Sequence, residues 1–342
     1  MRHIIFLGLM LLCLPATAKQ FLYVENTRSG HITVIAIPEH EVVGTFKAGN
    51  HPDDVVASPD GRVLYVNNHS DGQDGRNEIL AFDTITGDML WRVPVDGVPN
   101  HMSLSSDGRW LYVPFFDTRF TSVIDTVTKL EDRRIFGVLG GHGTKLSPDD
   151  KRLYIGSMVT DAIYVVDVAS GRPSNVINFE DGVRPFAFPS DEQTLYVQLS
   201  RLHGFDVADT ASREIVRRVD LPALPPDAPV MKAFPHTVNH GLELSPDEKY
   251  LLAAGSAANY VAVYTHPDLE VVKTIATGAE PNWIIYTPDS RFAYVTARAS
   301  DEISVIDMQK LEEIARIPST GDYPQRMRVV DVPASKLSLP DS

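Results

Sequence analysis

The sequence has almost no cysteine. Cys13 is the only one in 342 residues, and it lies within the apolar run from Ile4 to Leu14. Beyond that run the chain therefore has no disulfide, no thiolate metal ligand and no cysteine nucleophile. A long apolar segment is also missing from the rest of the sequence, so we expect no membrane span there.

Basic residues are fewer than acidic ones. The 31 lysines and arginines stand against 45 aspartates and glutamates, which gives a formal net charge of -14. Nucleic acid is therefore not expected as a partner, because phosphate binding requires a basic surface. The sequence also lacks a GxSxG nucleophile elbow, a Walker loop and an HExxH zinc motif, so these classes of enzyme are not indicated.

The N-terminal residues have the pattern of a signal peptide. Arg2 and His3 precede the apolar run, and Ala16 and Ala18 place small side chains where a signal peptidase requires them. The apolar run is too short to form a stable membrane anchor. We therefore predict a signal peptide over residues 1–18 and a periplasmic or secreted mature protein.

One phrase recurs along the chain: a Ser-Pro-Asp-Gly type of turn, a strand that carries an aromatic residue, a polar loop and a second strand. It reads SPDGRVLYVNN at Ser58, SSDGRWLYVPF at Ser105, SPDDKRLYIGS at Ser147, SPDEKYLLAAG at Ser245 and TPDSRFAYVTA at Thr287. One position of the aromatic strand recurs at Leu22, Leu64, Leu111, Leu153, Leu195, Leu251 and Ala293. These markers are 42, 47, 42, 42, 56 and 42 residues apart. A period near 42 residues is the length of a propeller blade.

Seven markers predict an all-β fold, a seven-bladed β-propeller with four-stranded antiparallel blades. The first unit lacks an innermost strand, whereas residues 323–330 form a strand with no unit after it. We expect this last strand to complete the first blade, so that the N-terminal strands close the ring and leave no open sheet edge. The domain prediction is a single propeller over residues 19–332, followed by a tail over residues 333–342.

The repeated phrase resembles the YVTN family of β-propeller proteins, and the resemblance covers essentially the whole mature chain. By fold it implies relatives among haem d1-binding propellers, lactonases and copper-bearing propeller oxidoreductases. It also implies that ligands bind at the face where the innermost strands begin. The motif specifies the fold strongly and leaves the function open.

Seven polar residues occupy one equivalent position near the start of the predicted inner strands, eight residues before the glycine position of the turn. They are Asp53, Asn100, His142, Arg184, His240, Asn282 and Gln325. The same strands are otherwise apolar. We therefore expect these seven side chains to form a polar ring at the mouth of the central channel.

Histidines gather at this ring and suggest a metal or haem site, since imidazole is the commonest neutral metal ligand. The predicted metal ligands are His51, His101, His142, His236 and His240. The predicted cofactor-binding residues are Arg184, Arg326, Asn100, Asn282 and Gln325. The cofactor would be copper, iron or zinc, or a haem, with the two arginines neutralising carboxylates. The alternative is a polar channel mouth in which the histidines only bridge water molecules.

The 56-residue spacing reveals an insertion over residues 221–235, which enters just before His236. Its many prolines exclude a helix or an interior strand, so we expect a loop. The loop would lie on the histidine-rich face as a lid carrying Met231 and Lys232. A neutral surface insertion is the alternative, because surface loops tolerate added residues at little cost.

Three functions fit these features. The first is an exported propeller that binds a metal ion or a haem-like cofactor, in redox chemistry or in the maturation of a redox enzyme. The second is a metal-assisted lyase or lactonase on the same face, with a histidine as general base and Arg184 stabilising an oxyanion. The third is a non-catalytic scaffold for a protein or glycan. We expect a monomer whose partner is a small-molecule ligand or a redox protein.

Overall fold

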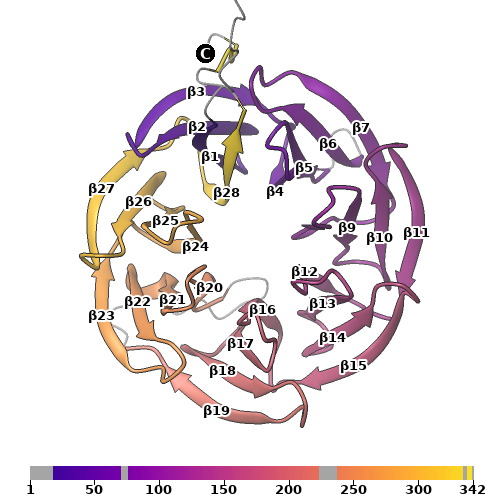
Figure 1. Ribbon diagram of the computed structural model, residues 1–342, viewed down its shortest axis with the longest axis vertical. Coiled ribbons are helices and arrows are strands. Elements are labelled where there is room, and N and C mark those ends of the chain that lie inside the picture. Colours follow the sequence, from indigo (N-terminus) through magenta and orange to yellow (C-terminus); the bar gives the residue numbers. More distant parts are fainter. Residues whose placement is uncertain (1–17, 71–75, 223–236, 334–336, 341–342) are drawn as a thin grey trace, which may run out of the picture.

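The computed structural model describes residues 18–70, 76–222, 237–333 and 337–340. These residues form seven four-stranded antiparallel sheets set around a central axis (Figure 1). The predicted seven-bladed propeller is therefore confirmed. His236 and the proposed lid residues Met231 and Lys232 lie outside the described residues, as does the predicted signal peptide up to residue 17.

Each blade has its innermost strand first and its outermost strand last. Blade 1 contains β28 (Pro324–Val332), β1 (Lys19–Asn26), β2 (His31–Ile37) and β3 (Glu41–Lys47). Blade 2 contains β4 (Pro52–Ala57), β5 (Val63–Asn68), β6 (Asn77–Asp83) and β7 (Met89–Val95). Blade 3 contains β8 (Ser103–Leu104), β9 (Trp110–Pro114), β10 (Phe120–Asp125) and β11 (Leu130–Phe136).

The other four blades follow in sequence order. Blade 4 contains β12 (Gly141–Leu146), β13 (Arg152–Ser157), β14 (Ala162–Asp167) and β15 (Arg172–Asn178). Blade 5 contains β16 (Val183–Ala187), β17 (Thr194–Leu199), β18 (Gly204–Asp209) and β19 (Ile215–Asp220). Blade 6 contains β20 (Leu242–Leu244), β21 (Tyr250–Gly255), the 3-10 helix η1 (Ser256–Ala258), β22 (Tyr260–Thr265) and β23 (Val271–Ala276). Blade 7 contains β24 (Pro281–Tyr286), β25 (Phe292–Ala297), β26 (Glu302–Asp307) and β27 (Glu312–Pro318).

Blade 1 closes the ring in the way that the sequence predicts. Strand β28 pairs antiparallel with β1, from Lys19 opposite Val332 to Asn26 opposite Pro324. The two ends of the propeller thus share one sheet, and the inner edge of β1 is not left open. Within the described part of the chain, no helix combines the length and apolar character needed to cross a membrane.

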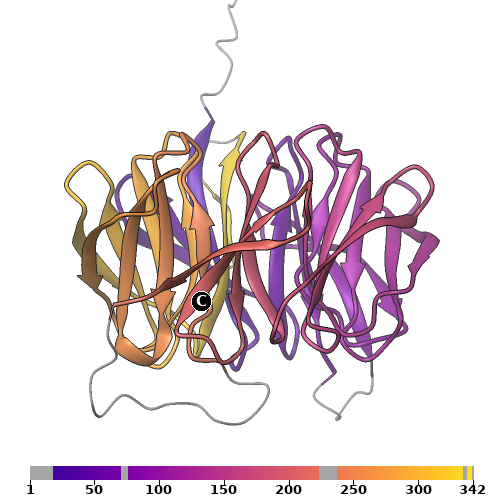
Figure 2. The ribbon, with the colours of Figure 1, turned by 90° about the horizontal axis from the view of Figure 1, so that it is seen from below.

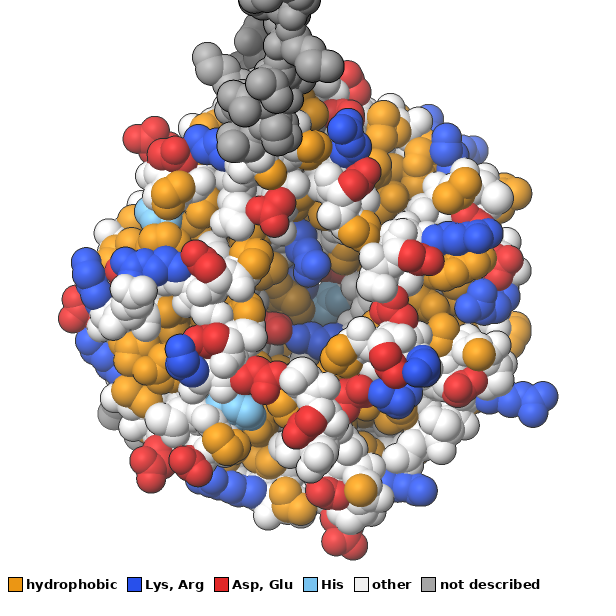
Figure 3. Space-filling model, viewed as in Figure 1, with side chains coloured by type: hydrophobic (Ala, Val, Ile, Leu, Met, Phe, Trp, Pro, Cys, Tyr) orange, Lys and Arg blue, Asp and Glu red, His pale blue; other side chains and the backbone are white. Residues whose placement is uncertain are grey.

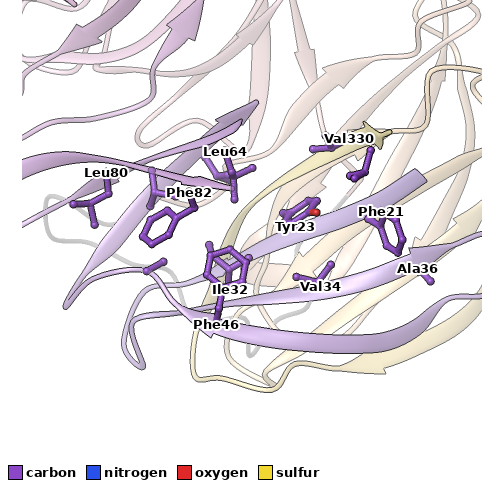
Figure 4. Close-up of a cluster of buried hydrophobic side chains, with 14 residues drawn as sticks. Phe21, Tyr23, Ile32, Val34, Ala36, Phe46, Leu64, Leu80, Phe82 and Val330 are labelled. Atoms are coloured by element: carbon purple, nitrogen blue, oxygen red, sulfur yellow. The ribbon is translucent and has the colours of Figure 1, made fainter. Parts of the chain in front are cut away.

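Seven apolar clusters fill the spaces between the sheets. The cluster between blades 1 and 2 contains Tyr23 and Phe46 from the first and Leu64 and Phe82 from the second (Figure 4). In this cluster Tyr23 and Leu64 are completely buried. The alternation of each strand sends one set of side chains to the blade before it and the other set to the blade after it.

The Ser-Pro-Asp turns follow a common hydrogen-bond plan. In blade 6, the Ser245 hydroxyl donates to the Asp247 carboxylate at 2.7 Å and accepts from the backbone N–H of Tyr250 at 3.0 Å. The next residue after Asp247, Glu248, has a positive φ of 56°, a conformation that suits glycine. Gly61 takes this position in blade 2 with φ of 68°. The repeated turn thus fixes how each inner strand ends.

The inner strands all begin at one face of the propeller and end at the other. We call the face where the inner strands begin the loop face and the face where they end in Ser-Pro-Asp turns the turn face. Figure 2 shows the ring edge-on, with the strands running between these two faces.

Candidate functional site

The residues of the predicted polar ring lie near the start of the inner strands, at the loop face, and most of them are buried. The buried members are Asp53, Asn100, His142, Arg184, His240 and Asn282. Gln325 is half-buried and donates from its amide to the Asp53 carboxylate at 2.5 Å. Asn100 donates to the carbonyl oxygen of Gly141 in the next blade at 3.1 Å. These two contacts therefore link neighbouring blades.

Backbone bulges accompany most of these side chains. The pairing of inner strand with second strand shifts register at Asp53, at His142 and at Asn282, where two inner-strand residues face one partner. Arg184 and Gln325 lie at equivalent irregularities. A bulge bends its strand and redirects a side chain. This is why a polar side chain can face the channel here within an otherwise regular and apolar strand.

Three of the predicted histidines meet in the channel. The ring centroids of His101 and His142 are 4.3 Å apart, those of His142 and His240 are 5.7 Å apart, and those of His101 and His240 are 6.2 Å apart. All three side chains are buried. They come from blades 3, 4 and 6. We call them the imidazole cluster.

A buried arginine stands against this cluster. The guanidinium of Arg326 donates to Asn282 Oδ1 at 3.0 Å and to Nε2 of His101. Its central carbon lies 4.2 Å from the ring centroid of Trp283. Burial lowers the pKa of Arg326, while the nearby carboxylates of Asp53 and Asp54 act in the opposite direction. The arginine is thus a fixed cation within the channel, against the imidazole cluster.

Asn282 sets the tautomer of His240. Its backbone carbonyl oxygen lies 3.2 Å from His240 Nδ1, and because a carbonyl can only accept, Nδ1 must carry the proton. In the neutral ring, Nε2 of His240 is then an unprotonated base. The same Asn282 accepts from Arg326 through its side chain. One residue therefore holds a base and a cation in fixed positions.

The imidazoles are held neutral. Burial lowers the pKa of His240 and of His142 well below the ordinary value, and the positive charges of Arg326 and Arg184 lower both further. Burial likewise lowers the pKa of His101. Neutral imidazoles can accept a proton, so the cluster can work as a base at neutral pH.

Several buried polar atoms at the ring have no hydrogen-bond partner. Among the described residues of the inner strands these are Nδ1 of His142, Nδ2 of Asn282 and Nε of Arg326. Buried polar groups are normally paired, and an unpaired one is expensive. Three such atoms near the imidazole cluster suit a ligand that carries hydroxyl and carbonyl groups.

The remaining predicted residues lie around this centre. Arg184 is buried and donates from Nε to Ser200 Oγ at 2.9 Å, and burial lowers its pKa to about 10. His51 is separate from the imidazole cluster and stacks on His69, with ring centroids 5.6 Å apart. Nε2 of His69 lies 3.7 Å from the Asp53 carboxylate. Within the part of the chain that the structure describes, no three or more His, Cys, Asp or Glu side chains are arranged to hold a metal ion.

Sequence reasoning missed Trp283, Asp54 and Glu25. Trp283 packs against both Arg326 and the imidazole cluster, with its ring centroid 5.4 Å from that of His101. Buried Glu25 accepts from the backbone N–H of Arg326 at 3.2 Å. When the seven repeats of this chain are superimposed, the position one residue after the polar ring holds Asp54, His101, Trp283 and Arg326 in four of the blades. This second shared position is the signal that could have pointed to Asp54 and Trp283.

Comparison with known proteins gives the family. A family model described as lactonase, 7-bladed beta-propeller matches residues 140–330, more than half of the chain. A 6-phosphogluconolactonase of Cronobacter sakazakii is 25% identical over 279 residues, which cover 72% of this chain and 77% of that protein.

Solved structures are similar in fold. A periplasmic gluconolactonase of Pseudomonas aeruginosa superimposes with a TM-score of 0.72 at 20% identity, covering 92% of this chain and 99% of that one. A dihydro-heme d1 dehydrogenase superimposes with a TM-score of 0.64 at 18% identity, covering 91% of this chain and 66% of that one. At these identities the likeness concerns the fold alone, although it includes the relationship to haem d1 propellers that the repeat implied.

These findings correct the first functional prediction. A metal or haem cofactor in redox chemistry is contradicted by the family match and by the lactonases among the relatives, which support the lactonase alternative instead. The physical reason for the error is that clustered imidazoles serve equally well as metal ligands and as neutral bases, and the sequence does not show which atoms neighbour them. The chain belongs to the lactonase family of seven-bladed β-propellers.

Proposed function

We propose that this chain is a lactonase that hydrolyses the ester bond of a sugar-acid lactone at the polar ring of its channel. The family match and the similarity to 6-phosphogluconolactonases support the reaction class. The observation that carries the proposal is the placement of His240 and Arg326 by Asn282. This arrangement supplies a neutral base and a fixed cation side by side.

The reaction follows from these two groups. His240 Nε2 takes a proton from a water molecule whose oxygen attacks the lactone carbonyl carbon. The carbonyl oxygen becomes an oxyanion, which the Arg326 guanidinium stabilises by charge and hydrogen bonding. The ring C–O bond then breaks, and the imidazolium returns its proton to the departing alkoxide oxygen. The products are a hydroxyl group and a carboxylic acid, which releases a proton at neutral pH.

The lowered pKa of His240 is compatible with this role. Burial and the arginines disfavour the imidazolium in the free protein. The oxyanion that forms in the same step supplies the missing negative charge, so the imidazolium is stabilised when it is needed. The unpaired atoms of His142 and Asn282 would bind the hydroxyl groups of the sugar acid.

A periplasmic location is part of this proposal. The predicted signal peptide supports it, as does the structural similarity to a periplasmic gluconolactonase. Release of the mature chain beginning at residue 19 into the periplasm of an expressing bacterium, checked by N-terminal sequencing of the periplasmic fraction, would test it.

The test of the activity is proton release from glucono-1,5-lactone and from its 6-phosphate, corrected for spontaneous hydrolysis. We expect turnover by the wild type, retained after treatment with EDTA. His240→Gln keeps a donor for the Asn282 carbonyl but cannot take up a proton, so kcat/KM should fall about 100-fold or more.

His31→Gln is the matched control. His31 lies on β2 of blade 1, and its ring contacts the backbone oxygen of Ser29. This variant should retain the wild-type rate. Hydrolysis by the wild type no faster than the spontaneous reaction, or an unchanged rate in His240→Gln, would refute the proposed mechanism.

A further inference from the structure

A cavity opens at the turn face, and His101 of the imidazole cluster lies among its lining residues. Its volume is about 800 Å³, within the usual range for small-molecule sites. Residues of the turns, such as Pro59, Pro148 and Pro288, form its rim, and His101, Trp283 and Asp54 lie among its deeper residues. Figure 3 shows the hollow at the centre of this face, with basic and histidine side chains inside it. We call this cavity the turn-face funnel.

The funnel wall carries a tier of side chains three residues after the polar ring. The uncharged members that line the funnel are Val56, Ser103 and Ile285, and the charged members are Lys145, Glu243 and Arg328. Lys145 donates to both carboxylate oxygens of Glu243 at 2.9 Å. This pair spans from blade 4 to blade 6 and neutralises two of the three charges.

Arg328 is the third charged residue of this tier and does not take part in the pair of Lys145 and Glu243. Its side chain lines the funnel. It makes no hydrogen bond and no ion pair with any described residue. The Arg328 side chain is exposed to the solvent of the funnel, and the carboxylates of Asp54 and Glu243 act on it electrostatically. Glu243 is already paired with Lys145, and Asp54 accepts from the backbone N–H of Met102 at 2.6 Å. The funnel thus holds an exposed arginine without a direct ion pair, and the two carboxylates that act on it electrostatically, Asp54 and Glu243, are each bonded to another group.

The rest of the funnel is suited to an apolar body. Met102, Leu104, Phe188, Met327 and Trp283 contribute to its lining. An aromatic or aliphatic group can pack against such a wall, while Arg328 binds a carboxylate with two hydrogen bonds. A phosphate ester of a sugar would match this apolar wall poorly, because most of the surface of such an ester is polar.

We propose that the turn-face funnel is a second ligand site, which binds a small organic carboxylate with an aromatic or aliphatic body and uses Arg328 as its anchor. This site is separate from the polar ring and does not depend on lactonase activity. Trp283 belongs to both regions, because it lines the funnel and stacks on Arg326. Occupation of the funnel would therefore act on the wall that supports the proposed catalytic arginine.

Calorimetric titration with 3-phenylpropionate tests this site, with 3-phenylpropan-1-ol as a neutral ligand of the same shape. We expect saturable binding of the carboxylate to the wild type with a Kd on the order of 1 mM or lower. The alcohol should bind at least about 10-fold more weakly, because it lacks the charge that pairs with Arg328.

Arg328→Gln should weaken carboxylate binding about 10-fold or more, and Arg328→Lys should restore part of it. Arg316→Gln, on the outer strand β27, is the control and should bind as the wild type does. Since the Arg328 side chain is exposed and makes no hydrogen bond or direct ion pair with a described residue, Arg328→Gln should unfold at the same denaturant concentration as the wild type. A variant that fails to fold would contradict that structural premise.

Two results would overturn the proposal. One is the absence of saturable binding to the wild type. The other is carboxylate binding that survives Arg328→Gln but disappears in His240→Gln, which would place the ligand at the polar ring. Neither result bears on lactone hydrolysis, which is measured separately.

Discussion

Asn282 is the residue on which the proposed active site depends most. Its backbone carbonyl accepts from His240, and its side-chain oxygen accepts from Arg326. Its amide nitrogen has no partner among the described residues. A single side-chain change here alters the electrostatics of the base without removing the base itself.

Asn282→Asp is therefore expected to change the pH dependence of the reaction. A carboxylate beside the imidazole cluster favours the protonated ring, so it raises the pKa of His240. The acidic limb of the kcat/KM profile should move to higher pH, because the base is lost to protonation earlier during acidification. The profile is measured from pH 4 to 8. Asn175→Asp on the outer strand β15 should leave it unchanged, and an unshifted profile in Asn282→Asp would contradict the role of His240.

His142 predicts a pH dependence of stability. Its folded-state pKa lies well below 6.5 because of burial, whereas the unfolded chain has the ordinary value. Between the two values the unfolded state binds more protons, so acidification below about pH 6.5 reduces the free energy of unfolding. The effect is at most about 1.4 kcal/mol per pH unit for one group.

His142→Gln removes this contribution. Urea unfolding at pH 7, 6 and 5 should show a weaker loss of stability on acidification than in the wild type. Asp54, whose pKa burial raises to about 6, acts in the opposite direction in both proteins and cancels in the comparison. Parallel pH dependences in the two proteins would show that His142 is not held neutral in the folded state.

At the scale of the strands and turns, the left-handed turn position links neighbouring blades. Asp150 accepts from the backbone N–H of Ser106 at 2.7 Å, and Glu248 accepts from that of Ser190 at 2.7 Å. Each bond runs from the turn of one blade to the turn of the blade before it. A non-glycine residue thus tolerates an unfavourable φ here because its side chain gains a partner in the preceding sheet.

Glu192 has the strongest of these links. It accepts from the Arg152 guanidinium at 2.7 and 2.9 Å and from the Tyr154 hydroxyl at 2.7 Å. Glu192→Ala leaves both donors of blade 4 without this acceptor and should lower the free energy of unfolding by about 2 kcal/mol. Denaturant unfolding measures this.

The control is an exposed ion pair on the outer strands. Lys273 and Glu312 approach to 3.4 Å with both side chains largely in water. Glu312→Ala should change the free energy of unfolding by no more than about 0.5 kcal/mol. Equal effects of the Glu192 and Glu312 substitutions would mean that the inter-blade bond contributes nothing particular.

At the scale of the whole molecule, residues near the C-terminus pack on the blade that closes the ring. Leu337 and Leu339 contact the cluster between blades 1 and 2, and the backbone N–H of Ser338 donates to the carbonyl of Ile85 at 2.8 Å. A Cβ placed on Gly44 would lie 2.5 Å from a methyl group of Leu339. The absence of a side chain at Gly44 is what lets the tail lie there.

Gly44→Val and Leu339→Ala are therefore expected to be coupled. Each single change should destabilise the protein by about 1 to 2 kcal/mol, the first by displacing the tail and the second by removing apolar contact. In the double variant the losses should not add, because the introduced valine side chain no longer meets a leucine side chain. Urea unfolding of the four proteins gives the interaction free energy, and strict additivity would exclude contact between the two positions.

The sequence by itself determined the seven blades, the closure of the ring and the seven equivalent polar positions near the start of the inner strands. These follow from a local pattern that repeats every 42 residues or so, and a repeated unit that cannot bury its own faces must stack on its neighbours. The sequence also identified Arg184, Arg326 and the histidines as candidate site residues. The redox function first predicted for them was wrong.

Only the tertiary structure decided which of these side chains meet. It separated His51 from the imidazole cluster, brought Arg326 to His101 and added Trp283. The sequence could not show this, because β-bulges shift the direction of side chains by one residue and because contacts across the channel join residues about 40 to 230 positions apart. The strand period and the order of the blades determine which residues occupy equivalent positions in the seven blades. The distances between these residues in the folded protein determine which reaction they can catalyse.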